Sequence, residues 1–134
     1  MCGKLEKYGI KNDELKWFKS YLQGRQQKVA CNGMLSKAMN VSIGVPQGSV
    51  LGPILFLLFA NDLGNFTPGA TLNCYADDTV LYVSAETAQE AITALQKCMH
   101  GVEKWHTANR LLVNASKSNF MLIGTNQKLN KIDI

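Results

Sequence analysis

The chain has 134 residues, of which 46% are hydrophobic and 18% are charged, so it suits one domain, or part of one, with enough apolar material for a core. Its net charge of +4 is uneven: residues 1–37 carry +5, whereas residues 38–134 carry −1. This basic third either faces phosphates or forms a solvated lysine face, and charge alone favours neither interpretation.

The four cysteines are widely separated and form no C-x-x-C pair, which argues against a zinc site and against a disulfide framework. Reduced thiols indicate an intracellular protein, nuclear or cytoplasmic. The most apolar run, Val50–Ala60, is too short for a bilayer, which takes about 20 residues, so we expect no membrane contact and a buried helix.

In chain order, apolar spacing predicts a helix over 13–22, and a turn-rich segment separates two expected strands at 27–31 and 38–43. A Gly/Pro-rich loop at 44–49 ends in Ser49, the expected N-cap of a helix over 50–62. A second loop is expected at 64–69.

Two short apolar runs, 72–76 and 79–83, flank Asp77 and Asp78, which is the spacing of a β-hairpin with these aspartates as its two-residue tip. Residues 86–107 follow a helical period, with a predicted apolar stripe of Ala88, Ala91, Ile92, Leu95, Met99 and Val102. Closing strands are expected at 111–113 and 119–124, joined by a turn.

Asp77 and Asp78 would project together from the tip of this hairpin. Two carboxylates held close repel one another, and a divalent cation relieves that repulsion. Oxygen ligands completed by water and phosphate favour Mg²⁺, with Mn²⁺ as an alternative. The competing interpretation is an ordinary polar turn.

The loop "GVPQGSVLGP" at 44–53 feeds a helix N-terminus, where unpaired N–H groups suit a phosphate or a nucleotide. Gly44 and Gly48 would permit close approach of a ligand to the backbone, and Gln47 can read a base or sugar edge. The alternative is a tight loop before a buried helix.

Taken together, "GVPQGSVLGPILFLLFANDL" and "CYADDTVLY" resemble the reverse transcriptases of non-long-terminal-repeat retrotransposons. The resemblance extends to "YGI…LKWFKSYLQGRQQKV" at 8–29 and to "WHTANRLLVNASKSNFMLIG" at 105–124, in the family's order. It implies an α+β fold, part of a right-hand polymerase palm with an antiparallel sheet backed by helices, in a single partial domain over 1–134. It also implies an RNA-directed DNA polymerase, a nucleotidyltransferase whose partners are an RNA template, a DNA primer and deoxynucleoside triphosphates.

On this resemblance, Asp77 and Asp78 match the aspartates of the family's Tyr-x-Asp-Asp motif and would hold the catalytic metals. In the family's two-metal phosphoryl transfer, these cations clamp the primer 3′-oxygen and the leaving phosphate oxygens. Tyr75 and Ala76 would pack beneath the tip and belong to the nucleotide- and template-binding residues. The residues that match the loop lining the nucleotide and template pocket are Gly44, Pro46, Gln47 and Gly48.

Lys117 matches a lysine near the departing pyrophosphate, as a neutralising ammonium or a general acid, and an exposed turn lysine is an equal alternative. Arg25 and Lys28, in the basic third, are candidates for nucleic-acid contact. The sequence contains no run resembling the family's first catalytic block, Asp-x-x-x-Ala-Phe-Asp. We therefore expect a palm fragment that needs the rest of a polymerase chain and is inactive alone. The alternative function is that of a non-catalytic nucleic-acid-binding remnant of a retroelement.

Overall fold

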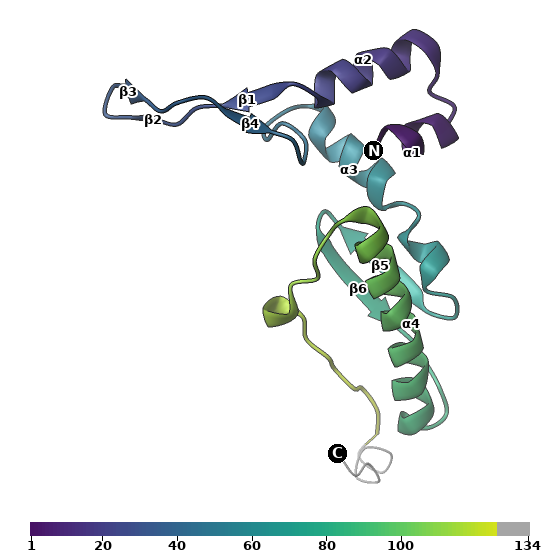
Figure 1. Ribbon diagram of the computed structural model, residues 1–134. Coiled ribbons are helices and arrows are strands. Elements are labelled where there is room, and N and C mark those ends of the chain that lie inside the picture. Colours follow the sequence, from purple (N-terminus) through teal and green to yellow (C-terminus); the bar gives the residue numbers. More distant parts are fainter. Residues whose placement is uncertain (126–134) are drawn as a thin grey trace. The chain divides into compact units, whose positions relative to one another are not determined.

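A computed structural model describes residues 1–125 as parts of two compact units, Met1–Ala60 and a second unit that begins at Asn61 (Figure 1). Both units combine helices with short antiparallel strand pairs, which confirms the α+β class. Where one antiparallel sheet was expected, the described residues form three separate two-stranded sheets, so the single sheet is wrong for this part of the chain. The single partial domain stays a prediction.

Three helices build the core of the first unit: α1 (Cys2–Lys7), α2 (Asn12–Leu22) and α3 (Leu51–Ala60). Each helix contributes one buried leucine to a common cluster, and half-buried apolar side chains surround it. The leucines are Leu5, Leu15 and Leu55. The predicted helix over 13–22 is confirmed, and the helix predicted over 50–62 is shorter at both ends.

The expectation of a buried helix holds for one face of α3 only. Leu55 is only 2% exposed, whereas Ile54 is 50% and Leu57 is 58% exposed. The three-helix core therefore covers one face of α3, and the apolar residues on its other face meet solvent. Ten residues span only about 15 Å. Of the helices in residues 1–125, none combines the length and apolarity needed to cross a membrane.

A long hairpin carries the strands of the first unit, but the predicted strands 27–31 and 38–43 are interrupted. β1 (Arg25–Gln27) pairs with β4 (Met39–Val41), and β2 (Ala30–Cys31) pairs with β3 (Met34–Leu35). Between the two pairs, the Ser36 hydroxyl accepts the N–H of Val29 at 2.9 Å. Because a side chain takes the place of a backbone acceptor there, the strand ladder is broken at this point.

In the second unit, the 3₁₀ helix η1 (Leu63–Phe66) occupies part of the loop predicted at 64–69. The predicted helix over 86–107 is confirmed as α4 (Ala88–Asn109). Thr87 starts it with a capping box, in which its side chain accepts the N–H of Glu90 while the Glu90 carboxylate accepts the N–H of Thr87. This reciprocal cap explains why the helix begins two residues later than predicted.

The buried stripe of α4 differs from the predicted one over its second half. Cys98 and Trp105 are 2% and 3% exposed, whereas Met99, placed in the stripe by the sequence, is 37% exposed. Trp105 also donates its Nε1–H to Asp62 Oδ1 at 2.7 Å. The segment around η1 therefore rests on α4 and decides which face of the helix is covered.

The closing strands predicted at 111–113 and 119–124 are wrong. Residues 111–125 contain only a short 3₁₀ helix, η2 (Ala115–Lys117), and Leu112 and Ile123 are 96% and 85% exposed. A strand satisfies its N–H and C=O groups only by pairing, and nothing in the described chain pairs with these segments. Apolar residues of 120–124 instead line a groove of about 250 Å³ together with the end of β6 (Asp78–Tyr82) and the first half of α4.

Candidate functional site

The two aspartates lie on the hairpin of β5 (Thr71–Tyr75) and β6. Its strands pair antiparallel, but the predicted tip is shifted by one residue: Ala76 and Asp77 form the turn, and Asp78 begins β6 opposite Tyr75. The positive φ of the turn, 51°, therefore falls on Ala76 and not on an aspartate. This register places Leu72 opposite Leu81, so two half-buried leucines share one face.

Asp78 lies on the open face of the hairpin. Because side chains alternate along a strand, it shares that face with Tyr75, Val80 and Tyr82, which are 83%, 60% and 51% exposed. The expectation that Tyr75 and Ala76 pack beneath the tip is wrong, since both are exposed. The aspartates thus lie beside exposed tyrosine side chains, and not above a buried tyrosine as the sequence had predicted.

Asp77 and Asp78 are both exposed, one in the turn and one in the strand ladder. Within residues 1–125, no three His, Cys, Asp or Glu side chains lie close enough together to hold a metal ion. Two adjacent carboxylates fit part of the oxygen shell of Mg²⁺ or Mn²⁺, and water, phosphate or a further carboxylate must complete it. Within residues 1–125 the hairpin therefore brings together two carboxylates and no third ligand.

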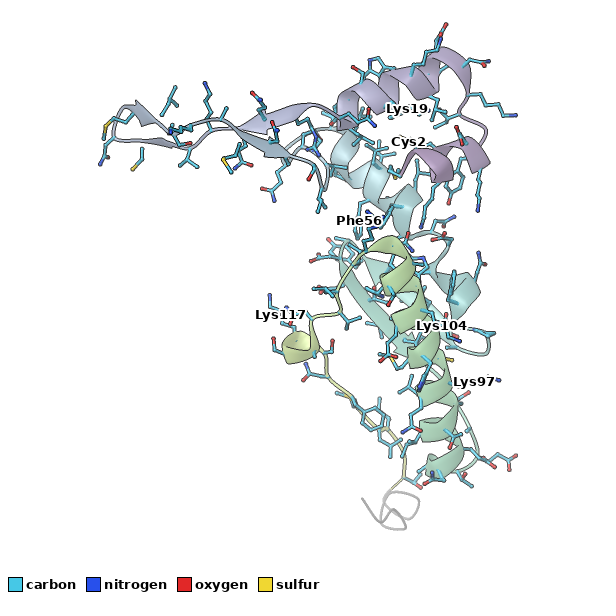
Figure 2. All side chains as sticks on the ribbon, viewed as in Figure 1. Cys2, Lys19, Phe56, Lys97, Lys104 and Lys117 are labelled. Carbon is cyan, nitrogen blue, oxygen red and sulfur yellow. The ribbon has the colours of Figure 1, made fainter. Side chains whose placement is uncertain are left out.

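Lys117 is the last residue of η2 and is exposed (Figure 2). No hydrogen bond or ion pair of the described chain joins it to Asp77 or Asp78. Its position is compatible with both interpretations of the sequence, a lysine that meets a phosphate and an exposed turn lysine.

The loop at 44–49 belongs to the first unit, and its shape is fixed from the helix side by Ser49. The Ser49 hydroxyl donates to the Pro46 carbonyl at 2.7 Å and accepts the Gly52 N–H at 3.1 Å. The predicted cap is therefore confirmed, although regular helix starts at Leu51. Gly44 and Gly48 have φ of 78° and 74°, a backbone region that favours glycine.

The exposed Gln47 lies between these fixed points, beside the half-buried Pro46. An amide side chain in this position can donate and accept hydrogen bonds with a ligand. The loop thus combines a fixed backbone with an accessible polar side chain.

Arg25 holds the other end of this loop, a role that the sequence did not reveal. Its Nη2 donates to the carbonyls of Gly44 at 2.5 Å and Ile43 at 3.4 Å, and its Nε donates to Leu22 at 3.1 Å. The guanidinium, predicted to contact nucleic acid, is thus engaged with protein backbone. Its acceptors are main-chain carbonyls up to 19 residues away, which no side-chain motif marks. Lys28 is exposed.

A family model described as reverse transcriptase (RNA-dependent DNA polymerase) matches residues 2–132. The chain belongs to the reverse transcriptase family. The resemblance inferred from the aspartate pair and the Gly/Pro-rich loop is thereby confirmed.

Curated relatives of this reverse transcriptase segment come from mobile elements of Drosophila melanogaster. The RNA-directed DNA polymerase from mobile element jockey is 33% identical over 106 residues, and a probable one from transposon X-element is 33% identical over 105. A probable RNA-directed DNA polymerase from transposon BS is 36% identical over 109 residues. The matches cover 74–75% of this chain but only 12% of the length of each relative. No solved structure matches.

Proposed function

We propose that this chain supplies the metal-binding hairpin and the nucleotide loop of an RNA-directed DNA polymerase. The observation that carries the proposal is the adjacent pair Asp77 and Asp78, exposed at the turn and at the first strand residue of a hairpin, in a chain that matches the family over 2–132. The partners are an RNA template, a DNA primer and deoxynucleoside triphosphates. The fold proposed for the complete unit is the polymerase palm.

The carboxylates of Asp77 and Asp78 would hold Mg²⁺, or Mn²⁺ in its place. When bound, the cations neutralise phosphate charge and orient the reacting oxygens for in-line phosphoryl transfer. Because the described residues bring only two such ligands together, we propose that a further carboxylate comes from another part of the polymerase. On this account the 134-residue chain alone does not extend a primer.

The loop at 44–49 would receive the nucleotide. Its glycine backbone permits close approach, Gln47 offers an exposed donor and acceptor, and Arg25 and Ser49 hold its two ends through backbone groups. Lys117 would place a positive charge near the departing pyrophosphate. These residues position the substrate and compensate its charge.

A chimera tests the proposal: the matching segment of the jockey polymerase is replaced by the corresponding residues of this chain. We expect primer extension on RNA that falls at least about 100-fold in Asp77→Asn, since a preorganised charge is lost. Asp13→Asn is the matched control, because Asp13 is an exposed aspartate paired with Lys16 at 2.8 Å. Equal activity of the two variants would rule out Asp77 as a metal ligand.

The second candidate function is that of a non-catalytic nucleic-acid-binding module. The observation that favours it is the excess of basic residues over 1–37, including the exposed Lys28 and Lys37 of the long hairpin. A module of this kind would bind RNA with an affinity that falls steeply with salt and does not depend on Mg²⁺ or on Asp77. Extension by the chimera that depends on Asp77 would exclude it.

A further inference from the structure

A basic groove lies along α4 in the second unit. It has a volume of about 460 Å³ and runs between the end of η1 and one face of the helix. Lys97, His100 and Lys104 line the helix side, while Phe66 and Pro68 line the other wall. Both lysines lie along α4 in Figure 2. We call this surface the α4 groove.

The three basic side chains share one helix face. At about 100° per residue, Lys97, His100 and Lys104 fall within about 60° of one another, and seven residues separate the lysines by about 10 Å along the axis. All three residues are exposed. His100 Nδ1–H donates to the Gln96 carbonyl at 2.9 Å, which leaves Nε2 of the neutral ring as an acceptor for a ligand.

No acidic residue lines the α4 groove. Within residues 1–125 neither Lys97 nor Lys104 forms an ion pair, and the helix's Glu103 lies about 120° away from Lys97. The two ammonium groups are therefore not neutralised by protein carboxylates in the groove. Such a surface attracts an anion with charges repeated along its length.

The shape of the groove depends on Gly101. A Cβ at this position would overlap the Phe66 carbonyl oxygen, so the absence of a side chain lets the backbone of η1 approach α4. Phe66 remains 38% exposed at the rim and offers an aromatic surface beside the lysines. An aromatic wall next to two spaced cations is the arrangement that single-stranded nucleic acids bind, with phosphates on the cations and a base on the ring.

We propose that the α4 groove binds a single strand of nucleic acid. The separation of about 10 Å between the lysines allows them to contact different phosphates of one strand. Lys97 and Lys104 each contact a phosphate, and a base stacks on Phe66. Between the lysines, His100 Nε2 accepts a hydrogen bond from a base N–H or a sugar hydroxyl. This site is separate from Asp77 and Asp78 and does not rest on polymerase activity.

The test is fluorescence anisotropy of labelled U12 and dT12 oligonucleotides with the 134-residue chain, measured as a function of salt. For single strands the slope of log affinity against log salt is about −0.7 per phosphate contact. We expect Lys97→Gln/Lys104→Gln to reduce the slope by about 1.4, and Lys97→Arg/Lys104→Arg to restore it. Comparison of U12 with dT12 shows which sugar is preferred.

Two control variants distinguish binding in the α4 groove from non-specific attraction between the positively charged chain and the oligonucleotide. Lys128→Gln/Lys131→Gln removes the same charge from two lysines that lie outside the basic residues 1–37 and should leave the slope unchanged. Phe66→Leu should weaken binding about tenfold at an unchanged slope, because stacking is lost while both lysines remain. Circular dichroism checks that each variant retains α4.

The proposal is overturned if the wild-type chain does not bind the oligonucleotides, or if both lysine pairs change the slope equally. A second result would also overturn it. In that case unlabelled hexaglutamate would displace labelled U12 as effectively as unlabelled U12 does, and Phe66→Leu would leave the affinity for U12 unchanged. That result would assign the α4 groove to an acidic protein segment.

Discussion

Replacing Gly101 by alanine is the most informative stability change in the second unit. A Cβ there would overlap the Phe66 carbonyl oxygen and lie 2.8 Å from its carbonyl carbon, whereas real Cβ contacts are at least 3.0 Å. Both neighbours are backbone atoms, so η1 or α4 must shift. We therefore expect η1 to separate from α4.

Three contributions determine the expected change in the free energy of unfolding. Alanine in a helix interior is favoured over glycine by about 1 kcal/mol. Against this, overpacking costs about 2 kcal/mol, and separation of η1 from α4 breaks the bond from Trp105 to the Asp62 carboxylate, worth about 2 kcal/mol. Gly101→Ala should thus lower the free energy of unfolding by about 3 kcal/mol and Tm by roughly 10 °C.

Thermal unfolding followed by Trp105 fluorescence in a Trp17→Phe background measures this change in the second unit. The matched control is Gly3→Ala, since Gly3 lies in α1 without a positive φ and a Cβ added to it would meet no atom within 4 Å. That variant should be neutral or stabilised by up to about 1 kcal/mol. If Gly101→Ala proves as stable as Gly3→Ala, the close packing of η1 on α4 is refuted.

Three further changes test other contacts. Trp105→Phe removes the hydrogen bond to Asp62 and should lower the free energy of unfolding in urea by about 2 kcal/mol; no loss would contradict the bond. Ser49→Ala removes the acceptor for the Gly52 N–H and should cost about 1 kcal/mol, whereas an unchanged urea midpoint would show that Ser49 is not a cap. Arg25→Lys keeps the positive charge but loses the planar guanidinium that donates to the carbonyls of Leu22 and Gly44. In the jockey chimera the KM for deoxynucleotide should therefore rise about tenfold with little change in kcat. A loss of kcat alone would contradict a role of Arg25 in positioning the loop.

Features with local causes could be predicted from the sequence. The α2 and α4 helices follow from apolar spacing, and the Ser49 cap follows from a serine placed just before an apolar run. The two aspartates of the candidate site are adjacent in the chain, so their proximity needed no knowledge of the fold. Each of these signals acts within a few residues.

Features with distant causes could not be predicted. The turn of the hairpin is set by the pairing of Leu72 with Leu81, which are nine residues apart, and not by the aspartates themselves. The segments 111–113 and 119–124 have the composition of strands but no partner in the described chain. Arg25 binds carbonyls 18 and 19 residues away, a contact that depends only on backbone positions.

We propose that Asp77 and Asp78 bind a divalent cation, and Mn²⁺-induced broadening of backbone amide signals would locate such a site. Substoichiometric Mn²⁺ should broaden the amide signals of residues 75–80 first. Excess Mg²⁺ should reverse the broadening, and Asp77→Asn/Asp78→Asn should abolish it. Asp13 and Glu14, also adjacent exposed carboxylates, are the internal control. Broadening that is equal at residues 13–14 and at the hairpin, or absent from the hairpin, would contradict the account.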